Sequence, residues 1–396
     1  MNPVRRPFPP RLALAAGGLL LACACARAAQ AGAPETAPAP ARAPAIDSKA
    51  YVLMDYDSGQ VLASANAEQA LPPASLTKMM TSFLVEQALK SGSLKPADQV
   101  RVSMNAWCHG SSVESCMYLP LDGQASVMDL LRGIVVQSGN DAAKAVAEHM
   151  AGSEAGFAQL MNGEATRIGM VHTHFVNSTG LPEPGHAASA HDLALLARAI
   201  IHDSAEYYPI YAERTFKYNG ISRGNRNALL YTDPSVDGLK TGHTNEAGYC
   251  LTASAQRNGL RLISVIMGAP TVQSRADETR ALFNWGFGAY EKVRPYQPGT
   301  AVTTTSVDFG KADSLPVGIA HDWEVTVPRA QPQSLQTSFQ FNKDITAPIA
   351  KGDAVGNVVA TVNGKWLAQE PLIALVPVER AGFLQRSWQH IRKLFK

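Results

Sequence analysis

The sequence lacks several features that would point to common functional classes. Only 17% of its 396 residues are charged, and 35 basic side chains almost balance 33 acidic ones, so the net charge of +2 gives no overall reason to bind nucleic acid. It contains no HExxH metal-binding motif and no third ligand in sequence near His172 and His174, which favours structural roles for both and predicts neither metal nor cofactor. No repeat of fixed period occurs. With 46% hydrophobic residues, the chain is too apolar to be disordered and too long for one minimal domain.

The near-neutral total hides an uneven distribution of charge. Residues 1–28 contain four arginines and no acidic residue, and residues 380–396 contain five basic residues and no acidic one. Removing these nine charges from +2 leaves the body of the chain at −7. The two ends therefore differ in charge from the body of the chain.

The first 31 residues have the pattern of a secretory signal peptide. A basic lead is followed by the apolar run Leu12–Ala22, which is too short to span a membrane, and then by small residues that permit cleavage after Ala28 or Ala31. A lipid-attachment box ending at Cys23 is the alternative. Either form of processing predicts a mature chain outside the cytoplasm, in the periplasm. The Ala/Pro-rich residues 32–45 are expected to form an extended spacer.

Residues 380–396 predict an amphipathic helix at the other end of the chain. Apolar residues recur at steps of four, three and four, which places them on one helical face: Leu384, Trp388, Ile391 and Phe395. The other side is basic, and this combination is typical of helices that lie in the plane of an anionic membrane surface. We therefore expect peripheral attachment to the outer face of the cytoplasmic (inner) membrane. The alternative is a terminal helix packed on its own domain.

Between these ends, residues 46–292 predict a mixed α/β domain. A hairpin with a glycine turn is expected at 51–62, and strand-like segments at 249–253 and 261–267. Helical patterns fill much of the chain between them: 76–90, 127–136, 142–150, 157–168 and 190–202. Strands at both ends with helices between them predict one sheet that encloses a helical lobe.

The pattern of the sequence changes again in residues 293–378. Short β-branched runs are punctuated by proline and glycine, and no long helical pattern appears. This segment predicts a separate small all-β domain.

Three short motifs carry the candidate chemistry. Ser75-Leu76-Thr77-Lys78 is expected to open a helix, Ser138-Gly139-Asn140 to lie in a turn between helices, and Lys240-Thr241-Gly242 to precede the strands. Each motif is weak alone, but their order, spacing and contexts make coincidence improbable. Together they are the signature of penicillin-interacting serine enzymes.

The chemistry of an activated serine explains the first two motifs. Lys78 lies one helical turn from Ser75, so its amine can reach the hydroxyl, which is a poor nucleophile until a base takes its proton. The pKa of a lysine must fall by about three units from about 10.4 before it can act as that base near pH 7, through burial and a nearby cation such as Lys240. Ser138 is placed to pass a proton to a leaving nitrogen, and Asn140 to hold the lysine and a substrate amide.

The third motif provides a binding site for a carboxylate. Lys240 and Thr241 offer a cation and a hydroxyl, and Gly242 lets a substrate lie close against the backbone.

The chain resembles the serine D-alanyl-D-alanine carboxypeptidases, the low-molecular-mass penicillin-binding proteins of the type-5 class, from about residue 46 to its C-terminus. The stretches that carry the resemblance extend beyond the triplets: 73–81, 138–142, 174–177, 224–227 and 236–244. The family implies a β-lactamase/transpeptidase-like domain with an antiparallel sheet, followed by an all-β domain and an amphipathic tail.

The resemblance also implies roles for individual residues. Ser75 would be the acyl-ester nucleophile and Lys78 its proton acceptor, and the amides of Ser75 and His243 would form the oxyanion hole. Arg226 would join Lys240 and Thr241 around the terminal carboxylate. The expected substrate is a peptidoglycan stem pentapeptide that loses its last D-alanine, which implies a role in cell-wall biosynthesis and cell shape. β-Lactams are the expected inhibitors.

Three alternative functions are open at this point. A β-lactamase would need a deacylating base, and Glu183 is the only acidic residue in the loop where one might sit. A D,D-endopeptidase would cut cross-links, but its relatives generally lack the β domain. A catalytically silent wall-binding scaffold is disfavoured because every motif residue is intact.

The cysteines allow two further expectations. Cys108 and Cys116 lie eight apart in a loop-like stretch and could pair in an oxidising compartment, whereas Cys250, within a predicted strand, is expected to be a buried thiol. The stretch around the first two departs from the family pattern.

Overall fold

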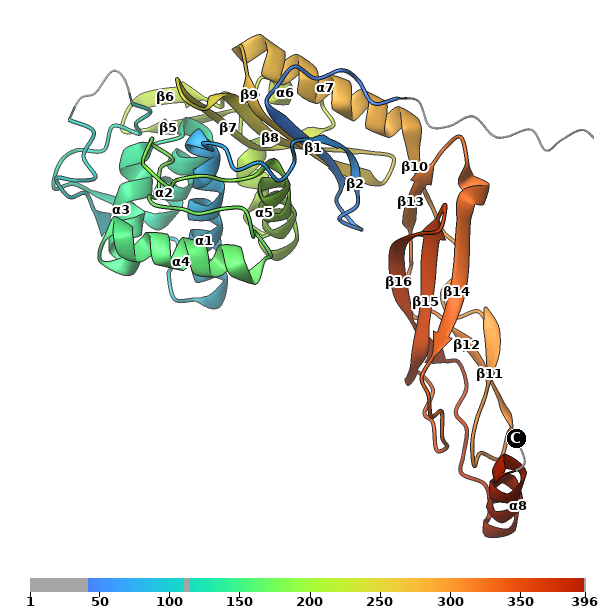
Figure 1. The fold of residues 1–396 in the computed structure, drawn as a ribbon. Helices are drawn as coiled ribbons and strands as arrows, with labels where there is room; N and C mark the ends of the chain where they lie inside the picture. The colour runs from blue at the N-terminus through green and yellow to red at the C-terminus, as the bar shows by residue number, and fades with distance from the viewer. Residues whose placement is uncertain (1–41, 110–113, 395–396) are drawn as a thin grey trace, which may run out of the picture. The chain divides into compact units, whose positions relative to one another are not determined.

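The computed structural model describes residues 42–109 and 114–394 of the chain. The predicted signal peptide, the lipid-attachment alternative at Cys23 and most of the predicted spacer lie outside these residues. The structure confirms the predicted fold class, a mixed α/β region followed by an all-β region (Figure 1).

The first region is built on a five-stranded antiparallel sheet with strand order β2-β1-β9-β8-β7. Its strands are β1 (Ala50–Asp55), β2 (Val61–Ala65), β7 (Val236–Thr244), β8 (Gly248–Arg257) and β9 (Leu260–Ala269). The predicted hairpin is β1–β2. Strands from both ends of the region therefore meet in one sheet, with β7 at an edge.

The sheet is covered on both faces. In β1, Val52 and Met54 belong to the core shared with the helical lobe, whereas Tyr51 and Leu53 belong to a second core on the opposite face. This alternation follows from the two-residue period of a strand, and burial of both faces explains why the strand is apolar from Ala50 to Met54.

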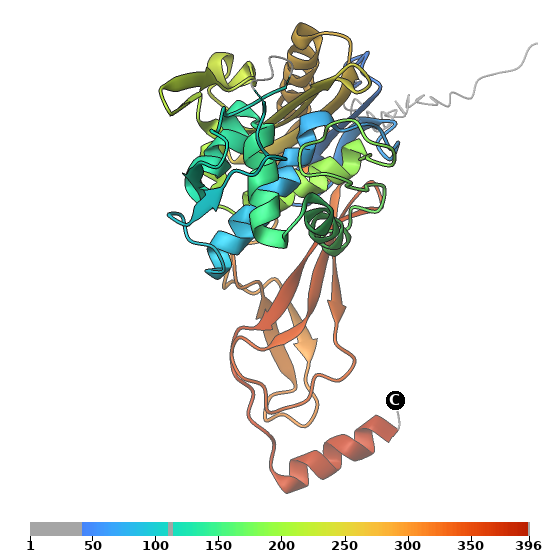
Figure 2. The same ribbon diagram turned by 90° about the vertical axis from the view of Figure 1, so that its left-hand side faces the viewer.

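The helical lobe lies on the first of these faces (Figure 2). Its helices are α1 (Lys78–Ser91), α2 (Val127–Arg132), the π-helical turn η2 (Gly133–Gln137), α3 (Asn140–Ala151), α4 (Glu154–Arg167) and α5 (Ala190–Asp203). The N-terminus of α5 is capped by Ser189, whose hydroxyl accepts from the backbone N–H of Asp192. Smaller elements complete the lobe: η1 (Ala74–Thr77), β3 (Gln99–Arg101), β4 (Gln124–Ser126), η3 (Tyr208–Ala212), β5 (Thr215–Tyr218) and β6 (Ile221–Gly224). The short helix α6 (Leu229–Thr232) packs instead into the core on the opposite face.

Of the sequence-based expectations for this region, one was incomplete and one was wrong. The helix α7 (Val272–Ala289), which covers the second face of the sheet, was not predicted. The Lys240-Thr241-Gly242 motif was expected to precede the strands, but it lies inside β7.

The second region is all-β, as predicted. A five-stranded sheet has the order β11-β12-β16-β15-β14, and β10 pairs separately with β13. The strands are β10 (Tyr290–Val293), β11 (Thr303–Ser306), β12 (Ser314–Gly318), β13 (Val325–Pro328), β14 (Leu335–Phe341), β15 (Ala354–Val362) and β16 (Lys365–Ala374), with the short turn η4 (Pro332–Ser334). These strands bury a hydrophobic core of their own.

A helix, α8 (Phe383–Leu394), ends the described chain within the segment predicted to be helical. Its described apolar side chains are open to solvent, with Leu384 84% and Trp388 63% exposed. Across residues 42–109 and 114–394, no helix combines the length and apolar character needed to cross a bilayer.

A buried acid on α1 predicts how stability depends on pH. Glu86 accepts a hydrogen bond of 2.8 Å from the Tyr211 hydroxyl, and burial raises its pKa from 4.5 to about 7. Because its pKa is higher in the folded than in the unfolded state, protonated Glu86 stabilises the folded protein. This stabilisation is fully present below about pH 4.5 and is lost as the pH rises through 7.

We therefore expect the variant Glu86→Gln to lose less stability than wild type between pH 5 and pH 8. The difference in the free energy of unfolding should be roughly 2 to 3 kcal/mol over this interval, measured by urea denaturation at both pH values. Equal pH dependence in the two proteins would contradict a buried, protonated Glu86.

Candidate active site

The first motif spans the junction between η1 and α1. Ser75 lies in the 3-10 turn η1 and is half-buried, and Lys78 is the first residue of α1 and is fully buried. The i to i+3 spacing brings Lys78 Nζ to 3.1 Å from Ser75 Oγ. The predicted pair is therefore in hydrogen-bond contact.

The partners of Lys78 determine how its amine is used. Besides Ser75, its Nζ contacts Asn140 Oδ1 and the carbonyl oxygen of Thr179, each at 2.7 Å. The last two can only accept a hydrogen bond, whereas a serine hydroxyl can accept or donate. A neutral amine that donates to Asn140 and Thr179 thus has its lone pair left for the proton of Ser75.

The surroundings of Lys78 favour that neutral state. Burial and, to a smaller extent, the positive charge of Arg226 lower its pKa from 10.5 to about 7, against an opposing effect of Asp141. About half of the lysine is then neutral at pH 7.

The second and third motifs meet on the other side of Ser75. Lys240 Nζ donates to Ser138 Oγ at 2.9 Å and to the Thr241 carbonyl at 3.0 Å. Burial lowers the pKa of Lys240 well below its usual value, and the charge of Lys78 adds to the effect. Ser138 has left-handed backbone angles at the end of the π-helical turn η2, just before α3 begins at Asn140. The predicted turn between helices is confirmed.

These residues border a cavity of about 690 Å³. Ser75, Ser138, Thr241, Gly242, His243 and Arg226 line it, as do Tyr118, Arg223, Tyr249 and Arg275. Lys78, Asn140 and Lys240 lie behind this lining. Their hydrogen bonds to Ser75, Glu114 and Ser138, respectively, connect them to it. The structure therefore brings together all nine site residues predicted from the sequence.

Gly242 has a reason for being glycine that the sequence did not indicate. A Cβ atom at this position would lie 3.1 Å from the backbone nitrogen of Ser75 and 3.0 Å from the carbonyl oxygen of Pro73. A side chain would therefore crowd the turn that carries Ser75. The glycine allows β7 to pack directly against η1.

A loop that carries no motif also takes part in the site. Gly180 packs so closely on η1 that a Cβ atom would lie 1.8 Å from the carbonyl oxygen of Ala74, and its φ of +81° also favours glycine. The loop delivers the Thr179 carbonyl to Lys78. It is held by His186, whose Nδ1 accepts from the Val176 N–H at 3.0 Å.

His186 also fixes the start of α1. With Nδ1 occupied as an acceptor, the neutral ring carries its proton on Nε2 and donates it to Thr77 Oγ1 at 2.8 Å. Burial lowers the pKa of His186 to about 4, which keeps the ring neutral. No motif or periodicity indicated this role, because the contact joins residues 109 positions apart.

We expect His186→Ala to reduce the rate of acylation by about tenfold while Ser75 remains intact, because the carbonyl that orients Lys78 loses its anchor. The measurement is the second-order rate of labelling by a fluorescent penicillin. His202→Ala, an exposed histidine at the end of α5, is the matched control. A labelling rate equal to that of wild type would show that the loop needs no support from His186.

Arg275, from the unpredicted helix α7, contacts the backbone of the strands β7 and β8 next to the site. Its guanidinium is buried and donates to the carbonyl oxygens of Gly242 at 3.3 Å and Cys250 at 3.4 Å. It also lies over the ring of Tyr249, which stacks on His243 with ring centroids 4.0 Å apart. The guanidinium of Arg275 thus places a positive charge at the cavity, although the body of the chain is acidic.

The remaining candidate residues lie elsewhere. Glu183, the acid considered as a β-lactamase base, lines a different cavity together with Pro182, Pro184 and Glu246. Cys108 and Cys116 form the disulfide that the sequence left open, and Cys250 is the predicted buried thiol.

His172 has neighbours that the sequence did not reveal. Its Nδ1 lies 2.9 Å from the carboxylate of Glu68, which also contacts His191 at 3.2 Å. The carboxylate of Asp192 accepts a hydrogen bond of 2.8 Å from the backbone N–H of His172. This cluster takes no part in the cavity that contains Ser75.

Comparison with known proteins agrees with the geometry. A family model described as D-alanyl-D-alanine carboxypeptidase matches residues 36–271, and a model described as the C-terminal domain of penicillin-binding protein 5 matches residues 290–380. The D-alanyl-D-alanine carboxypeptidase DacC of Escherichia coli (strain K12) is 44% identical over 358 residues, which cover 89% of this chain and 90% of that protein.

Solved structures agree as well. Penicillin-binding protein 5 from Haemophilus influenzae is 40% identical with a TM-score of 0.77, covering 86% of this chain and 99% of that one. Penicillin-binding protein 6B from Escherichia coli is 36% identical with a TM-score of 0.69, covering 86% of this chain and 98% of that one.

Proposed function

This chain belongs to the D-alanyl-D-alanine carboxypeptidase family, and from that premise we propose that Ser75 is its nucleophile and Lys78 the base that activates it. The protein is a penicillin-binding hydrolase of cell-wall metabolism. The observation that carries the assignment is the set of three hydrogen bonds at Lys78 Nζ, of which only the one to Ser75 can reverse its direction.

Acylation begins when neutral Lys78 accepts the Ser75 proton. The oxygen attacks the carbonyl carbon between the last two D-alanine residues of a peptidoglycan stem pentapeptide. The backbone N–H groups of Ser75 and His243 receive the developing negative charge, and two such donors are typically worth several kcal/mol of barrier. Gly242 keeps β7 close enough to η1 for both amides to serve one oxygen.

Collapse of the tetrahedral intermediate needs a proton on the leaving nitrogen. Ser138 Oγ supplies it and is resupplied by Lys240, with which it shares a 2.9 Å hydrogen bond. D-Alanine leaves, and the proton that Lys78 took from Ser75 passes back to Lys240. Neutral Lys78 then takes a proton from water, which attacks the ester, and returns that proton to the Ser75 oxygen as the acyl group leaves.

The carboxylate of the substrate is bound by Lys240, Thr241 and Arg226. Thr241 and Arg226 line the cavity, and β7 is an edge strand, so its outer backbone can pair with an extended peptide. A penicillin offers a carboxylate and a strained amide in the same arrangement. It acylates Ser75 and leaves slowly.

Three substrates separate this proposal from its alternatives. Purified full chain is incubated with a pentapeptide that ends in two D-alanines, with a cross-linked muropeptide dimer, and with penicillin. We expect rapid release of D-alanine, slow cleavage of the dimer, and one penicillin bound per chain with slow turnover. Rapid penicillin hydrolysis would indicate a β-lactamase, and preferential cleavage of the dimer an endopeptidase.

For localisation, we propose a periplasmic protein whose segment 380–396 attaches it to the anionic outer face of the inner membrane. The exposed Leu384 and Trp388 on α8 support this proposal, as do the basic residues of the segment. The predicted signal peptide supports export.

The variant Leu384→Glu/Trp388→Glu should lose most binding to vesicles that contain anionic lipid, because two charges replace the apolar contacts with the bilayer. Vesicle sedimentation measures binding, and release of D-alanine from a soluble peptide serves as the control for folding. Val376→Glu, an exposed apolar position outside the helix, is the matched control. Full retention of vesicle binding by the double variant would show that the apolar face of α8 is not what attaches the protein to the membrane.

A further inference from the structure

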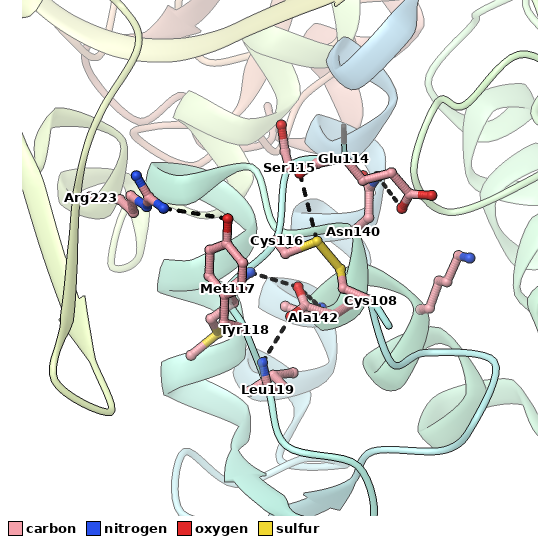
Figure 3. The surroundings of a disulfide bond; sticks show 12 residues. Cys108, Glu114, Ser115, Cys116, Met117, Tyr118, Leu119, Asn140, Ala142 and Arg223 are labelled. Atoms are coloured by element: carbon pink, nitrogen blue, oxygen red, sulfur yellow. Dashed lines mark hydrogen bonds between the residues drawn. A yellow bond between two sulfur atoms is a disulfide. The ribbon is translucent and has the colours of Figure 1, made fainter. Parts of the chain in front are cut away.

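The disulfide between Cys108 and Cys116 lies at the wall of the active site (Figure 3). Cys116 itself lines the cavity, together with Glu114 and Ser115 immediately before it. Both half-cystines are buried, and their Cα atoms are 6.4 Å apart. The covalent link thus fixes the position of two residues that face the substrate site.

Glu114 and Ser115 set the orientation of Asn140. Its backbone N–H donates to the Ser115 carbonyl at 2.7 Å, and its side-chain Nδ2 donates to Glu114 Oε2 at 3.1 Å (Figure 3). An amide group whose nitrogen faces a carboxylate must present its oxygen on the other side. That oxygen is the atom that accepts from Lys78 at 2.7 Å.

Ser115 also positions the arginine assigned to the substrate carboxylate. Its Oγ accepts a 2.6 Å hydrogen bond from Arg226 Nη1. Arg226 extends from the loop after the β5–β6 hairpin. The same two residues beside the disulfide therefore contact both the amide-binding and the carboxylate-binding parts of the site.

The segment that follows is anchored independently of the disulfide. The backbone N–H groups of Met117 and Leu119 donate to the carboxylate of Asp141 at 2.8 and 3.0 Å. Opening the disulfide should therefore leave residues 117–119 in place. The loss of order should be confined to the positions of Glu114 and Ser115.

We propose that the Cys108–Cys116 disulfide is a positioning element for the carboxypeptidase reaction: it holds Glu114 and Ser115 so that Asn140 and Arg226 are ready to bind substrate. This inference rests on the proposed function of the site. Among the described residues, neither half-cystine is a hydrogen-bond partner of Ser75 or Lys78. Its loss should weaken substrate binding more than turnover.

Reduction provides a way to test this without changing the sequence. A water-soluble phosphine donates two electrons to the disulfide, water supplies the two protons and the oxygen, and the products are two thiols and the phosphine oxide. Removal of the phosphine and addition of oxidised glutathione re-forms the bond by thiol–disulfide exchange and leaves reduced glutathione.

The experiment compares wild type, Cys108→Ser/Cys116→Ser and Cys250→Ala, each with and without phosphine, in D-alanine release from the pentapeptide. Mass spectrometry reports the state of the thiols. In wild type and Cys250→Ala, we expect reduction to lower kcat/KM by about tenfold, mostly through KM, and reoxidation to restore it. The serine double variant should be low throughout and insensitive to phosphine. Stoichiometric penicillin labelling in every state would confirm that the nucleophile is intact.

A further substitution tests whether the effect passes through Ser115. Ser115→Ala should raise KM in the oxidised protein, but it should add little to the serine double variant, because the two changes disrupt the same contact. Independent, additive effects, or a double variant with the kcat/KM of oxidised wild type, would overturn the proposal. If oxidised wild type itself released no D-alanine, the failure would lie with the proposed function instead.

Discussion

Replacing Ser75 by alanine should lower D-alanine release from a pentapeptide by at least about 10⁴-fold and abolish covalent labelling by penicillin. The variant removes only the oxygen that is to carry the acyl group, at a half-buried position in a 3-10 turn. The turn and the surrounding cavity should keep their shape because the Cβ atom is retained. Free D-alanine and fluorescent-penicillin labelling are measured on the same preparation.

Ser91→Ala, at the exposed C-terminal end of α1, is the matched control and should keep the wild-type rate. The thermal midpoint of Ser75→Ala should stay close to that of wild type, which separates a chemical loss from an unfolded protein. Release of D-alanine by Ser75→Ala at the wild-type rate would show that the nucleophile has been assigned to the wrong residue.

The sequence was sufficient to predict which candidate groups lie together within each motif, because the motifs are short and their geometry is local. Ser75 and Lys78 are in contact through helical spacing, and Ser138 and Asn140 lie in and after one turn between two helices. Local spacing of this kind is independent of the rest of the fold. The motifs therefore indicated both the residues and their neighbours.

The surroundings of these groups could not be predicted in the same way. Thr179 and His186 reach the first motif across 101 and 109 positions, in a loop with no periodicity. Arg275 comes from α7, a helix that was not predicted from the sequence. Such contacts depend on how the elements pack, which propensity and period do not encode.

The position of the third motif shows the same limit. Lys240-Thr241-Gly242 lies in a stretch with two glycines and two charged residues, a composition that disfavours a strand. The stretch is nevertheless a strand because it pairs with β8 along its length, from Val236 to Thr244. Tertiary pairing overrides the local preference, and it is this pairing that aims Lys240 at Ser138.

The proposed reaction uses both buried lysines, Lys78 and Lys240, for two different proton transfers. Burial lowers the pKa of each lysine. The charge of Arg226 lowers both values further, and the charge of Lys78 also lowers the pKa of Lys240. Lys78, whose pKa is about 7, can accept a proton from Ser75, while Lys240 donates a proton to the leaving nitrogen through Ser138. The reaction then begins and ends with the same number of protons on the pair.

Lys78→Arg should reduce acylation by about 10²- to 10⁴-fold, which is the usual contribution of a positioned general base. Arginine keeps N–H donors for Asn140 and Thr179 but stays protonated at every working pH, so it cannot take the Ser75 proton. In wild type, Lys78 with a pKa of about 7 predicts an acylation rate that is half-maximal near pH 7. Below that pH the amine is protonated, and the rate should fall to about 3% of its plateau at pH 5.5.

Both expectations are measured by the second-order rate of penicillin labelling between pH 5 and pH 9. Lys90→Arg, on the exposed end of α1, is the matched control and should reproduce the wild-type profile. A flat profile in wild type, or an arginine variant within tenfold of it, would mean that Lys78 is not the base. Lys240 would then be the remaining candidate, because its amine is the other one that reaches a motif serine. The outcome therefore decides which of the two lysines starts the reaction.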